Sequence, residues 1–196
     1  MEIEVVRDPA ARLAADAVLA AQLDALSERS AVAQQLGRAI TSSALFASAQ
    51  QRQQTLYIAR STSSGEALGY LKTGVKHLFY VVRDVLSNQV SAGHHSYFTV
   101  PYGQSVYVGG QNTKGEYSEL DPHCILDFYI SEEHQRSGVG LQLFQRLLQS
   151  ENIEPRQLAY DRPSPKLIAF LRKHCELTEF FAQPNNFVIF DDYFST

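Results

Sequence analysis

The spacing of apolar residues changes along the chain, from a helical repeat near the N-terminus to strand-like segments further on. Within Ala10–Arg38, apolar side chains recur at intervals of about three to four residues, which predicts one or two amphipathic helices with a break at Ser27–Ser30. A short strand is expected before them at Ile3–Val6, because this segment alternates weakly and ends at Asp8-Pro9. Ile40–Gln54 has no clear period and is expected to form a loop.

Strand signals dominate the rest of the chain and are interrupted by two helical segments. The expected strands are Thr55–Arg60, Ala67–Val82 with a break at Gly74, Ser105–Gly109, Cys124–Ile130 and Gln157–Tyr160. The expected helices are Leu141–Leu148 and Ser164–Lys173. Near the C-terminus, Thr178–Ala182 and Phe187–Phe190 flank a turn-forming stretch, which predicts a hairpin. Asp84–Gln104 is expected to be an irregular insertion.

This order of elements predicts an α/β fold whose mixed, mostly antiparallel central sheet is flanked by helices. A chain of 196 residues is long enough to bury a sizeable core, and 44% hydrophobic residues favour an ordered protein. We therefore expect one domain over residues 1–196, with an insertion at about 84–104.

Charge and cysteine content narrow the class of protein. The formal net charge of −4 gives no general electrostatic case for a nucleic-acid or membrane partner. The two cysteines, Cys124 and Cys175, lack zinc-site spacing, so no metal is expected. The N-terminus does not resemble a secretory signal, and no apolar run approaches membrane-spanning length. A reduced, cytoplasmic location is the expectation.

The chemistry-bearing segment is the turn between the strand Cys124–Ile130 and the helix that follows. It ends in Gln135-Arg136-Ser137-Gly138-Val139-Gly140. Free backbone N–H groups at a helix start attract anions, and glycines let a ligand approach the backbone closely. This arrangement suits a pyrophosphate, to which Arg136 can add a charged contact. A glycine-rich turn that only caps a helix is the alternative; the signatures of P-loop and Rossmann sites are absent.

Gln135-x-x-Gly138-x-Gly140 resembles the pyrophosphate loop of the GNAT acetyltransferase superfamily. Longer strings resemble the α-tubulin N-acetyltransferase family more narrowly: Cys124–Ile130, Leu143-Phe144-Gln145, Gln157-Leu158-Ala159, Asp161–Ser164 and Asn185–Phe190, and more loosely Gly69–Phe79 and Ile40-Thr41-Ser42. The likeness is dense from Cys124 to the end and patchy before it.

The resemblance implies that acetyl-CoA is the co-substrate. The residues expected to hold it, from the strand, the turn and the later helix, are Phe128, Tyr129, Ile130, Gln135, Arg136, Ser137, Gly138, Val139, Gly140, Leu141, Ser164, Lys166, Arg172 and Lys173. A backbone N–H of Phe128–Ile130 is expected to support the thioester oxygen, and the pantetheine arm can lie along that strand as an added strand would.

The acceptor implied by the resemblance is a lysine ε-amine in the lumenal loop of α-tubulin. Because a lysine pKa is about 10.4, roughly one amine in 2,500 is neutral at pH 7, so the enzyme must remove a proton. We assign this role to Asp161, at the end of a strand, and the alternative for it is a turn or helix-capping aspartate. Gln50 matches the spacing of the family's essential glutamine, whose amide can orient the lysine or the catalytic carboxylate; the alternative is a solvated loop glutamine, like its neighbours Gln51, Gln53 and Gln54. Cys124 is expected to be a wall or auxiliary base beside direct attack; its alternative is a small buried hydrophobe.

Five residues are expected to contact the substrate: Lys72, Lys76, Phe79, Asp127 and Arg162. For Asp127 a structural role is equally open. The resemblance implies a monomer that acts on microtubules in the cytoplasm and cytoskeleton, including the axoneme of a cilium or flagellum. Two alternatives stay open: a GNAT enzyme for another protein or a small amine, and a non-catalytic module that binds microtubules.

Overall fold

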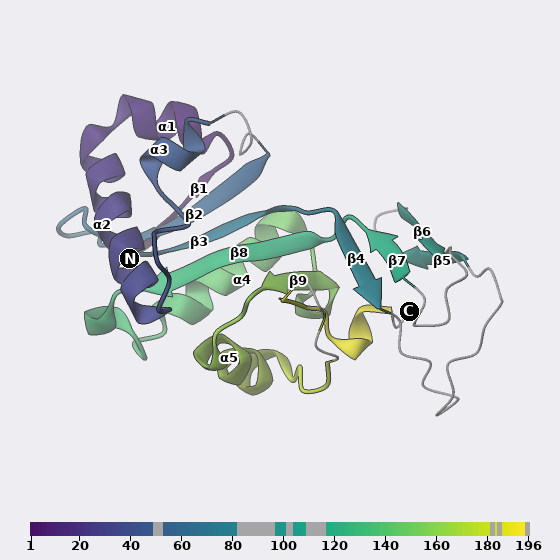
Figure 1. The fold of residues 1–196 in the computed structure, drawn as a ribbon. Coiled ribbons are helices and arrows are strands. Elements are labelled where there is room, and N and C mark those ends of the chain that lie inside the picture. Colours follow the sequence, from purple (N-terminus) through teal and green to yellow (C-terminus); the bar gives the residue numbers. More distant parts are fainter. Residues whose placement is uncertain are drawn as a thin grey trace. The chain divides into compact units, whose positions relative to one another are not determined.

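The structure is a computed structural model that describes residues 1–48, 53–81, 97–100, 104–108, 117–180, 183 and 186–194 (Figure 1). The chain divides into two compact units. The first comprises residues 1–74 and 125–154, and the second comprises residues 75–124 and 155–196. We refer to them as unit 1 and unit 2 and describe each by itself.

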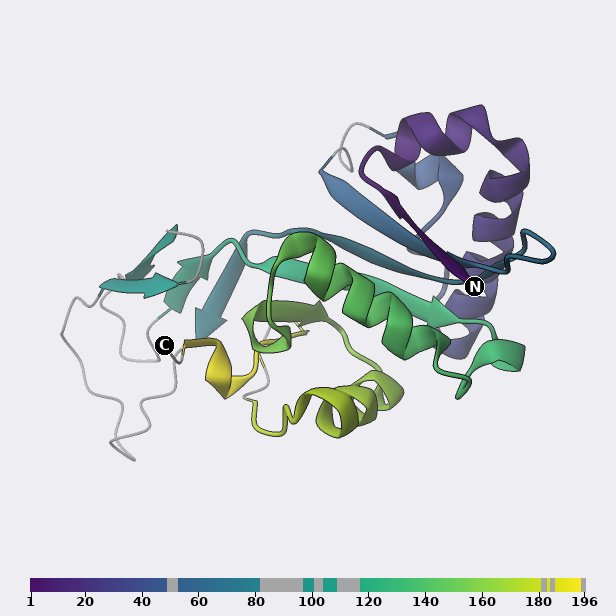
Figure 2. The same cartoon turned by 180° about the vertical axis from the view of Figure 1, so that it is seen from behind.

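Unit 1 is a sheet with helices on both faces. Its strands are β1 (Glu2–Val6), β2 (Gln54–Arg60), β3 (Ala67–Val75) and most of β8 (His123–Ile130), hydrogen-bonded in the order β1-β2-β3-β8. Both β1–β2 and β2–β3 are antiparallel. The helices are α1 (Pro9–Ala15), α2 (Ala17–Ala33), α3 (Ser43–Phe46) and α4 (Val139–Glu151), with a short 3-10 turn η2 (Glu132–His134). Figures 1 and 2 show α1 to α3 on one face of this sheet and α4 on the other.

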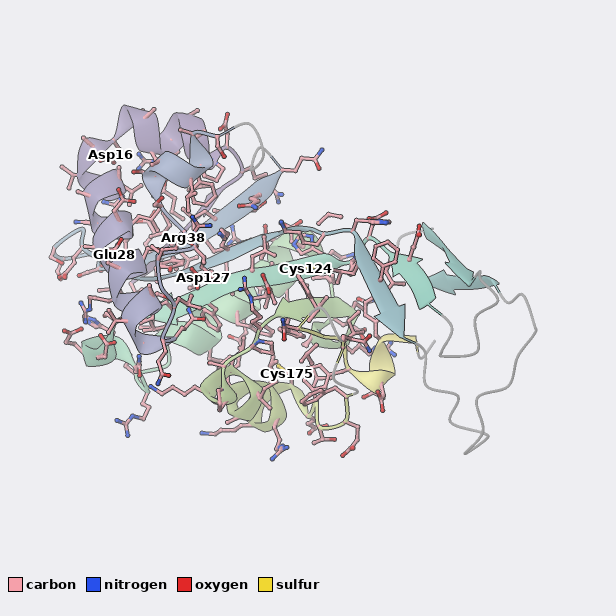
Figure 3. The ribbon with its side chains drawn as sticks, in the orientation of Figure 1. Asp16, Glu28, Arg38, Cys124, Asp127 and Cys175 are labelled. Atoms are coloured by element: carbon pink, nitrogen blue, oxygen red, sulfur yellow. The ribbon has the colours of Figure 1, made fainter. Side chains whose placement is uncertain are left out.

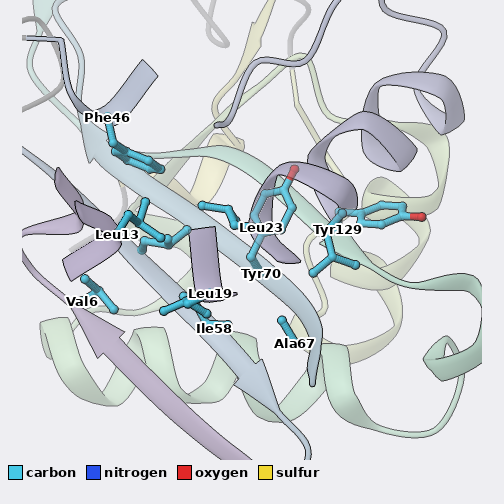
Figure 4. Close-up of a cluster of buried hydrophobic side chains, with 11 residues drawn as sticks. Val6, Leu13, Leu19, Leu23, Phe46, Ile58, Ala67, Tyr70 and Tyr129 are labelled. Carbon is cyan, nitrogen blue, oxygen red and sulfur yellow. The ribbon is translucent and has the colours of Figure 1, made fainter. Parts of the chain in front are cut away.

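The core of unit 1 follows from strand alternation, in which successive side chains point to opposite faces. Leu56 and Ile58 of β2 point toward α1 and α2, whereas Tyr57 between them bonds to Glu151 of α4. The cluster on the α1–α2 side is drawn in Figure 4 and contains Val6, Leu13, Leu19, Leu23, Leu26, Phe46, Leu56, Ile58, Ala67, Tyr70 and Tyr129. Burial of these side chains fixes α1 to α3 against the sheet.

Unit 2 carries a second sheet and a two-stranded ladder. The sheet has the order β4-β7-β6-β5, from β4 (Leu78–Val81), β5 (Tyr97–Val100), β6 (Gln104–Val108) and β7 (Tyr117–Leu120), with every neighbouring pair antiparallel. The ladder pairs β9 (Leu158–Asp161) with β10 (Phe187–Val188). Helix α5 (Pro165–Cys175) and the 3-10 turns η3 (Pro155–Gln157) and η4 (Asp191–Phe194) complete it.

The predicted fold class is confirmed: helices flank a mixed, mostly antiparallel sheet. Within the helical stretch, however, the break lies at Asp16 and not at Ser27–Ser30. Asp16 ends α1 and caps α2, because its carboxylate accepts the N–H of Leu19 at 2.9 Å. Ser27 and Ser30 lie inside α2 and are buried. The stretch expected to be a loop contains α3, which is capped by Ser42.

The strand predictions differ from the structure at their breaks. β3 runs through Gly74, and the interruption before β4 falls at Lys76 and His77. Part of the expected irregular insertion is regular, since residues 97–100 form β5. At the C-terminus β10 pairs with β9, and Phe180 bridges Phe190, so the expected hairpin is reduced to one bridge within the described residues.

Candidate functional site

The turn that leads into α4 has a backbone that few residue types adopt. Gly138 is the N-cap of α4 with φ of 89°, and Arg136 has φ of 62°. Only glycine enters this left-handed region without cost. Within the described residues, no side chain caps the first turn of α4. The first backbone amides of α4 lie at the positive end of the helix dipole, which favours a nearby anion.

Short hydrogen bonds hold this turn in shape. Gln135 does not face outward: its side-chain amide donates to the carbonyl of Ile130 at 2.9 Å and so ties the turn to the end of β8. Ser137 Oγ donates to the carbonyl of His134 at 2.6 Å, and Ser131 Oγ lies 2.8 Å from His134 Nδ1. The turn is therefore preorganised before any ligand enters.

The two faces of β8 serve different neighbours. On one face, a Cβ added to Gly140 would lie 3.6 Å from Phe128 Cζ and 3.5 Å from Ile130 Cγ1, so the start of α4 rests against these side chains. Tyr129 points to the other face, where it joins the core under α2. The structure thus brings Phe128, Ile130 and Gly140 together, and it separates Tyr129 from them.

Asp127, expected to contact substrate or to be structural, lies buried on the α2 face of β8 (Figure 3). Its Oδ2 accepts from Thr41 Oγ1 at 2.6 Å and from Tyr70 OH at 2.7 Å. Its Oδ1 accepts from Gln34 Nε2 at 3.2 Å and from Ser30 Oγ at 3.4 Å. Burial, and after it the charge of Asp127, raises the pKa of Tyr70 well above its usual range. This geometry favours the structural role.

Lys72 is also occupied within unit 1. Its side chain is buried, and the ammonium donates to the carbonyl of Ile40 at 2.5 Å and lies 5.9 Å from the ring centre of Phe46. Lys72 is not exposed on the strand, because β3 turns this residue toward the segment that precedes and includes α3. The geometry therefore weighs against direct substrate contact by Lys72.

Asp161 is the last residue of β9 in unit 2, and its side chain is 16% exposed. Arg162 Nε donates to Asp161 Oδ1 at 3.0 Å. The alternative that Asp161 caps the next helix is excluded, because Ser164 is the N-cap of α5 and accepts the N–H of Leu167 at 3.2 Å. Arg162 has φ of 41°, so the chain turns sharply after the carboxylate.

Cys124 is fully buried in unit 2, and its thiol donates to the carbonyl of Pro122 at 3.3 Å. Burial, followed by the charge of Asp161, raises the pKa of Cys124 well above its usual range. The sulfur therefore stays protonated at neutral pH, which makes it a poor nucleophile and a poor base.

The surface expected to meet the substrate is mixed in charge. Lys76 and Phe79 are exposed, Phe79 by 53%. His77 between them packs its ring edge-on against Phe79, with centroids 5.5 Å apart. His77 Nδ1 lies 2.9 Å from Asp121 Oδ1, and His77 Nε2 lies 3.7 Å from Glu119 Oε2. Two carboxylates thus border the residues Lys76 and Phe79 that are expected to contact the substrate.

The remaining expected residues are placed as follows. Lys166, Arg172 and Lys173 are exposed on α5, the last two in its final turn, where cations also favour the helix dipole. Gln50 lies outside the described residues. Among the described residues, no helix could cross a membrane and no cluster of three His, Cys, Asp or Glu side chains could hold a metal.

Sequence reasoning missed the contacts that hold the turn from outside. Arg29 of α2 forms ion pairs with Glu132 and Glu133, and Tyr129 OH donates to Glu132. Opposite charges about a hundred residues apart give no local signal. The pairing arises only in the folded chain, where α2 lies beside β8.

The chain is similar to one family of enzymes and to several of its members. A family model described as "GNAT acetyltransferase, Mec-17" matches residues 3–93 and 104–196. The α-tubulin N-acetyltransferase of Phytophthora infestans is 47% identical over 209 residues, covering 100% of this chain and 99% of that protein. The one from Tetrahymena thermophila is 40% identical over 172 residues, 88% of this chain and 34% of that protein. α-Tubulin N-acetyltransferase 1 of Danio rerio is 34% identical over 178 residues, 89% of this chain and 49% of that protein. The chain thus spans nearly all of the first relative, but half or less of the other two.

Proposed function

The chain belongs to the Mec-17 family of GNAT acetyltransferases, and on that premise we propose that it transfers an acetyl group from acetyl-CoA to a lysine of α-tubulin. The observation that carries the proposal is the full-length similarity to the Phytophthora infestans α-tubulin N-acetyltransferase. The residues proposed to act on the lysine belong to unit 2. The residues proposed to bind the diphosphate of acetyl-CoA lie at the start of α4. We also propose that residues 1–196 act as a single catalytic domain.

The start of α4 fits the diphosphate of coenzyme A. The left-handed Gly138, the uncapped first turn and the exposed Arg136 together form an anion-binding helix start. When bound, acetyl-CoA supplies the acetyl group as an activated thioester. On the side of the protein, Gly140 keeps α4 close to Phe128 and Ile130, and Gln135 holds the turn onto β8. Val139, Leu141 and Ser137 complete this part of the site, and Ser164, Lys166, Arg172 and Lys173 are proposed contacts from α5.

Asp161 is the proposed proton acceptor for the lysine. Its carboxylate is largely buried but still 16% exposed, so an incoming ammonium can reach it. A carboxylate beside the amine attracts the ammonium and holds it in position. The neighbouring Arg162 donates a hydrogen bond from Nε to this carboxylate at 3.0 Å. The proposed role of Gln50 is to orient the lysine or this carboxylate.

The state of Cys124 supports direct attack of the amine over a covalent acetyl-cysteine. Burial and the charge of Asp161 raise the pKa of this thiol, so little thiolate exists near pH 7. Two roles are proposed for Cys124, a wall of the site and an auxiliary base. A buried, protonated thiol agrees better with the first role.

The proposed acceptor is a lysine in the lumenal loop of α-tubulin within microtubules. Lys76, Phe79 and Arg162 are the proposed contacts, because all three are exposed in unit 2. Lys72 and Asp127 are set aside from this list because both are held inside unit 1. We further propose that the protein acts as a monomer on cytoplasmic and axonemal microtubules.

An acceptor competition tests this function. The full chain is incubated with acetyl-CoA and an equimolar mixture of microtubules, histone peptide and spermidine, and mass spectrometry quantifies acetylation of each. We expect acetyl groups on α-tubulin, with β-tubulin as an internal control. Acetylation of the peptide or the polyamine in place of α-tubulin would favour a GNAT enzyme for another acceptor. Microtubule binding without any transfer would favour a non-catalytic module.

A further inference from the structure

The turn before the anion-binding helix start carries two adjacent carboxylates, which is unfavourable chemistry for a diphosphate site. Glu132 and Glu133 precede Gly138 by only six and five residues. Both side chains are more than half exposed, at 53% and 64%. Like charges near a bound anion lower its affinity, and adjacent carboxylates also repel each other. Something must offset this charge if the turn is to bind a diphosphate.

Arg29, near the C-terminal end of α2, meets both carboxylates at once. Its Nη2 lies 2.5 Å from Glu132 Oε2 and 2.7 Å from Glu133 Oε2, and its Nε donates to Glu132 Oε2 at 3.2 Å. Tyr129 OH donates to the other oxygen of Glu132 at 2.6 Å. A planar guanidinium can bridge two carboxylates in this way, whereas an ammonium is a single point charge.

The bonds to Glu132 also determine the face of β8 on which its carboxylate lies. Tyr129 points toward α2, on the face of β8 opposite to Phe128, Ile130 and Gly140. The carboxylate of Glu132 is bonded to both Tyr129 and Arg29, so it is drawn toward the α2 face and away from the start of α4. Arg29 thereby offsets one of the two negative charges of Glu132 and Glu133. It also fixes the position of these carboxylates.

We propose that Arg29 is a positioning residue for coenzyme A binding: it holds Glu132 and Glu133 on the α2 side of β8 and keeps the start of α4 electropositive. This inference rests on the proposed function, and it adds to it a role for the N-terminal helix α2. Arg29 itself contacts no part of the reaction.

Isothermal titration of coenzyme A into the full chain tests the proposal. Arg29→Gln should weaken binding by about fivefold at low salt, the scale of a surface ion-pair network. The loss should shrink at high salt, because the charges are exposed and screened. Arg38→Gln is the matched control: within the described part of the chain Arg38 is exposed and makes no ion pair, so affinity should not change. In acetyl transfer, Arg29→Gln should raise the KM for acetyl-CoA and leave kcat unchanged.

The triple variant Arg29→Gln, Glu132→Gln, Glu133→Gln separates charge placement from simple structural damage. With the carboxylates neutralised, affinity should return to within about twofold of the wild type, because the repulsion is gone. Arg29→Lys, which keeps the charge but not the fork, should be intermediate and serves if Arg29→Gln does not fold. Unchanged affinity in Arg29→Gln, or no recovery in the triple variant, overturns the proposal. Failure of the wild type to bind coenzyme A would instead overturn the proposed function.

Discussion

At the scale of single residues, Asp127 shows how hydrogen bonds can satisfy both oxygens of a buried carboxyl group. Its four donors come from α2, from the segment before α3 and from β3, so one side chain joins three parts of unit 1. Buried charges are tolerated when hydrogen bonds satisfy their oxygens. Lys72 donates to the carbonyl of Ile40 and so holds the same segment before α3 in place.

Asp127→Asn should therefore destabilise the fold. The new amide turns two hydrogens toward hydroxyl donors such as Thr41 and Tyr70, and at least one pair loses its bond. We expect a loss of about 3 kcal/mol in the free energy of unfolding, as for hydrogen bonds to a buried charge. Urea unfolding measures this loss when the free energy of unfolding depends on urea concentration with the same slope in both proteins. Asp192→Asn on the exposed turn η4 is the control and should stay within about 0.5 kcal/mol. An equally stable Asp127→Asn would contradict the structural role.

At the scale of elements, the close approach of β3 and β8 depends on Gly69. A Cβ at this position would lie 2.5 Å from Ile130 Cδ1 and 2.6 Å from the carbonyl oxygen of Tyr129. The oxygen belongs to the backbone of β8 and cannot move aside without shifting the strand. Because β8 leads directly into the turn before α4, any shift is passed to the proposed coenzyme A site at the start of α4.

Gly69→Ala is predicted to cost about 2 kcal/mol of stability through overpacking, and to weaken coenzyme A binding. Gly37→Ala is a matched control, since a Cβ there meets nothing within 4 Å. Thermal unfolding and coenzyme A titration of both variants give the comparison. If Gly69→Ala matched Gly37→Ala in both measurements, the close approach of β3 and β8 would have no consequence.

The ion-pair network around η2 predicts a contribution to stability that acid removes. The hydrogen bond from Tyr129, and then the hydrogen bond from Arg29, lowers the pKa of Glu132 from 4.5 to about 2. A carboxylate with a lowered pKa stabilises the fold above its unfolded-state pKa, and this contribution is lost as pH falls through the folded value. The stability difference between the wild type and Glu132→Gln should therefore shrink between pH 4.5 and pH 2. Urea unfolding across this range measures it; a constant difference would argue against the network.

At the scale of the whole molecule, local signals predicted some elements well. The strand around Cys124–Ile130 and the helix after it were expected from their period and their glycines, and α5 from its own spacing. The break at Asp16 was available too, since an aspartate in an Ala-rich stretch is a capping signal.

Other features depend on partners distant in sequence, and no local pattern contains them. Ser30 is buried inside α2, and its hydroxyl donates to Asp127, which lies 97 residues away in the sequence. Lys72 is turned inward, where its ammonium donates to the carbonyl of Ile40, and alternation alone cannot tell a buried lysine from an exposed one. Arg29 and its two glutamates are joined only by the packing of α2 beside β8. Tertiary packing, and not propensity, decided each case.

Asp161, the proposed proton acceptor, is the last residue of β9 in unit 2. The most direct test of this role is site-resolved mass spectrometry of α-tubulin after microtubules are incubated with acetyl-CoA and either the wild type, Asp161→Asn or the control Asp192→Asn. Matched melting temperatures and matched coenzyme A affinity ensure that only the proton acceptor differs. We predict acetylation of an α-tubulin lysine by the wild type and the control, with transfer by Asp161→Asn slower by about a hundredfold or more. Equal rates for all three proteins, or no acetyl group on α-tubulin from the wild type, would contradict it.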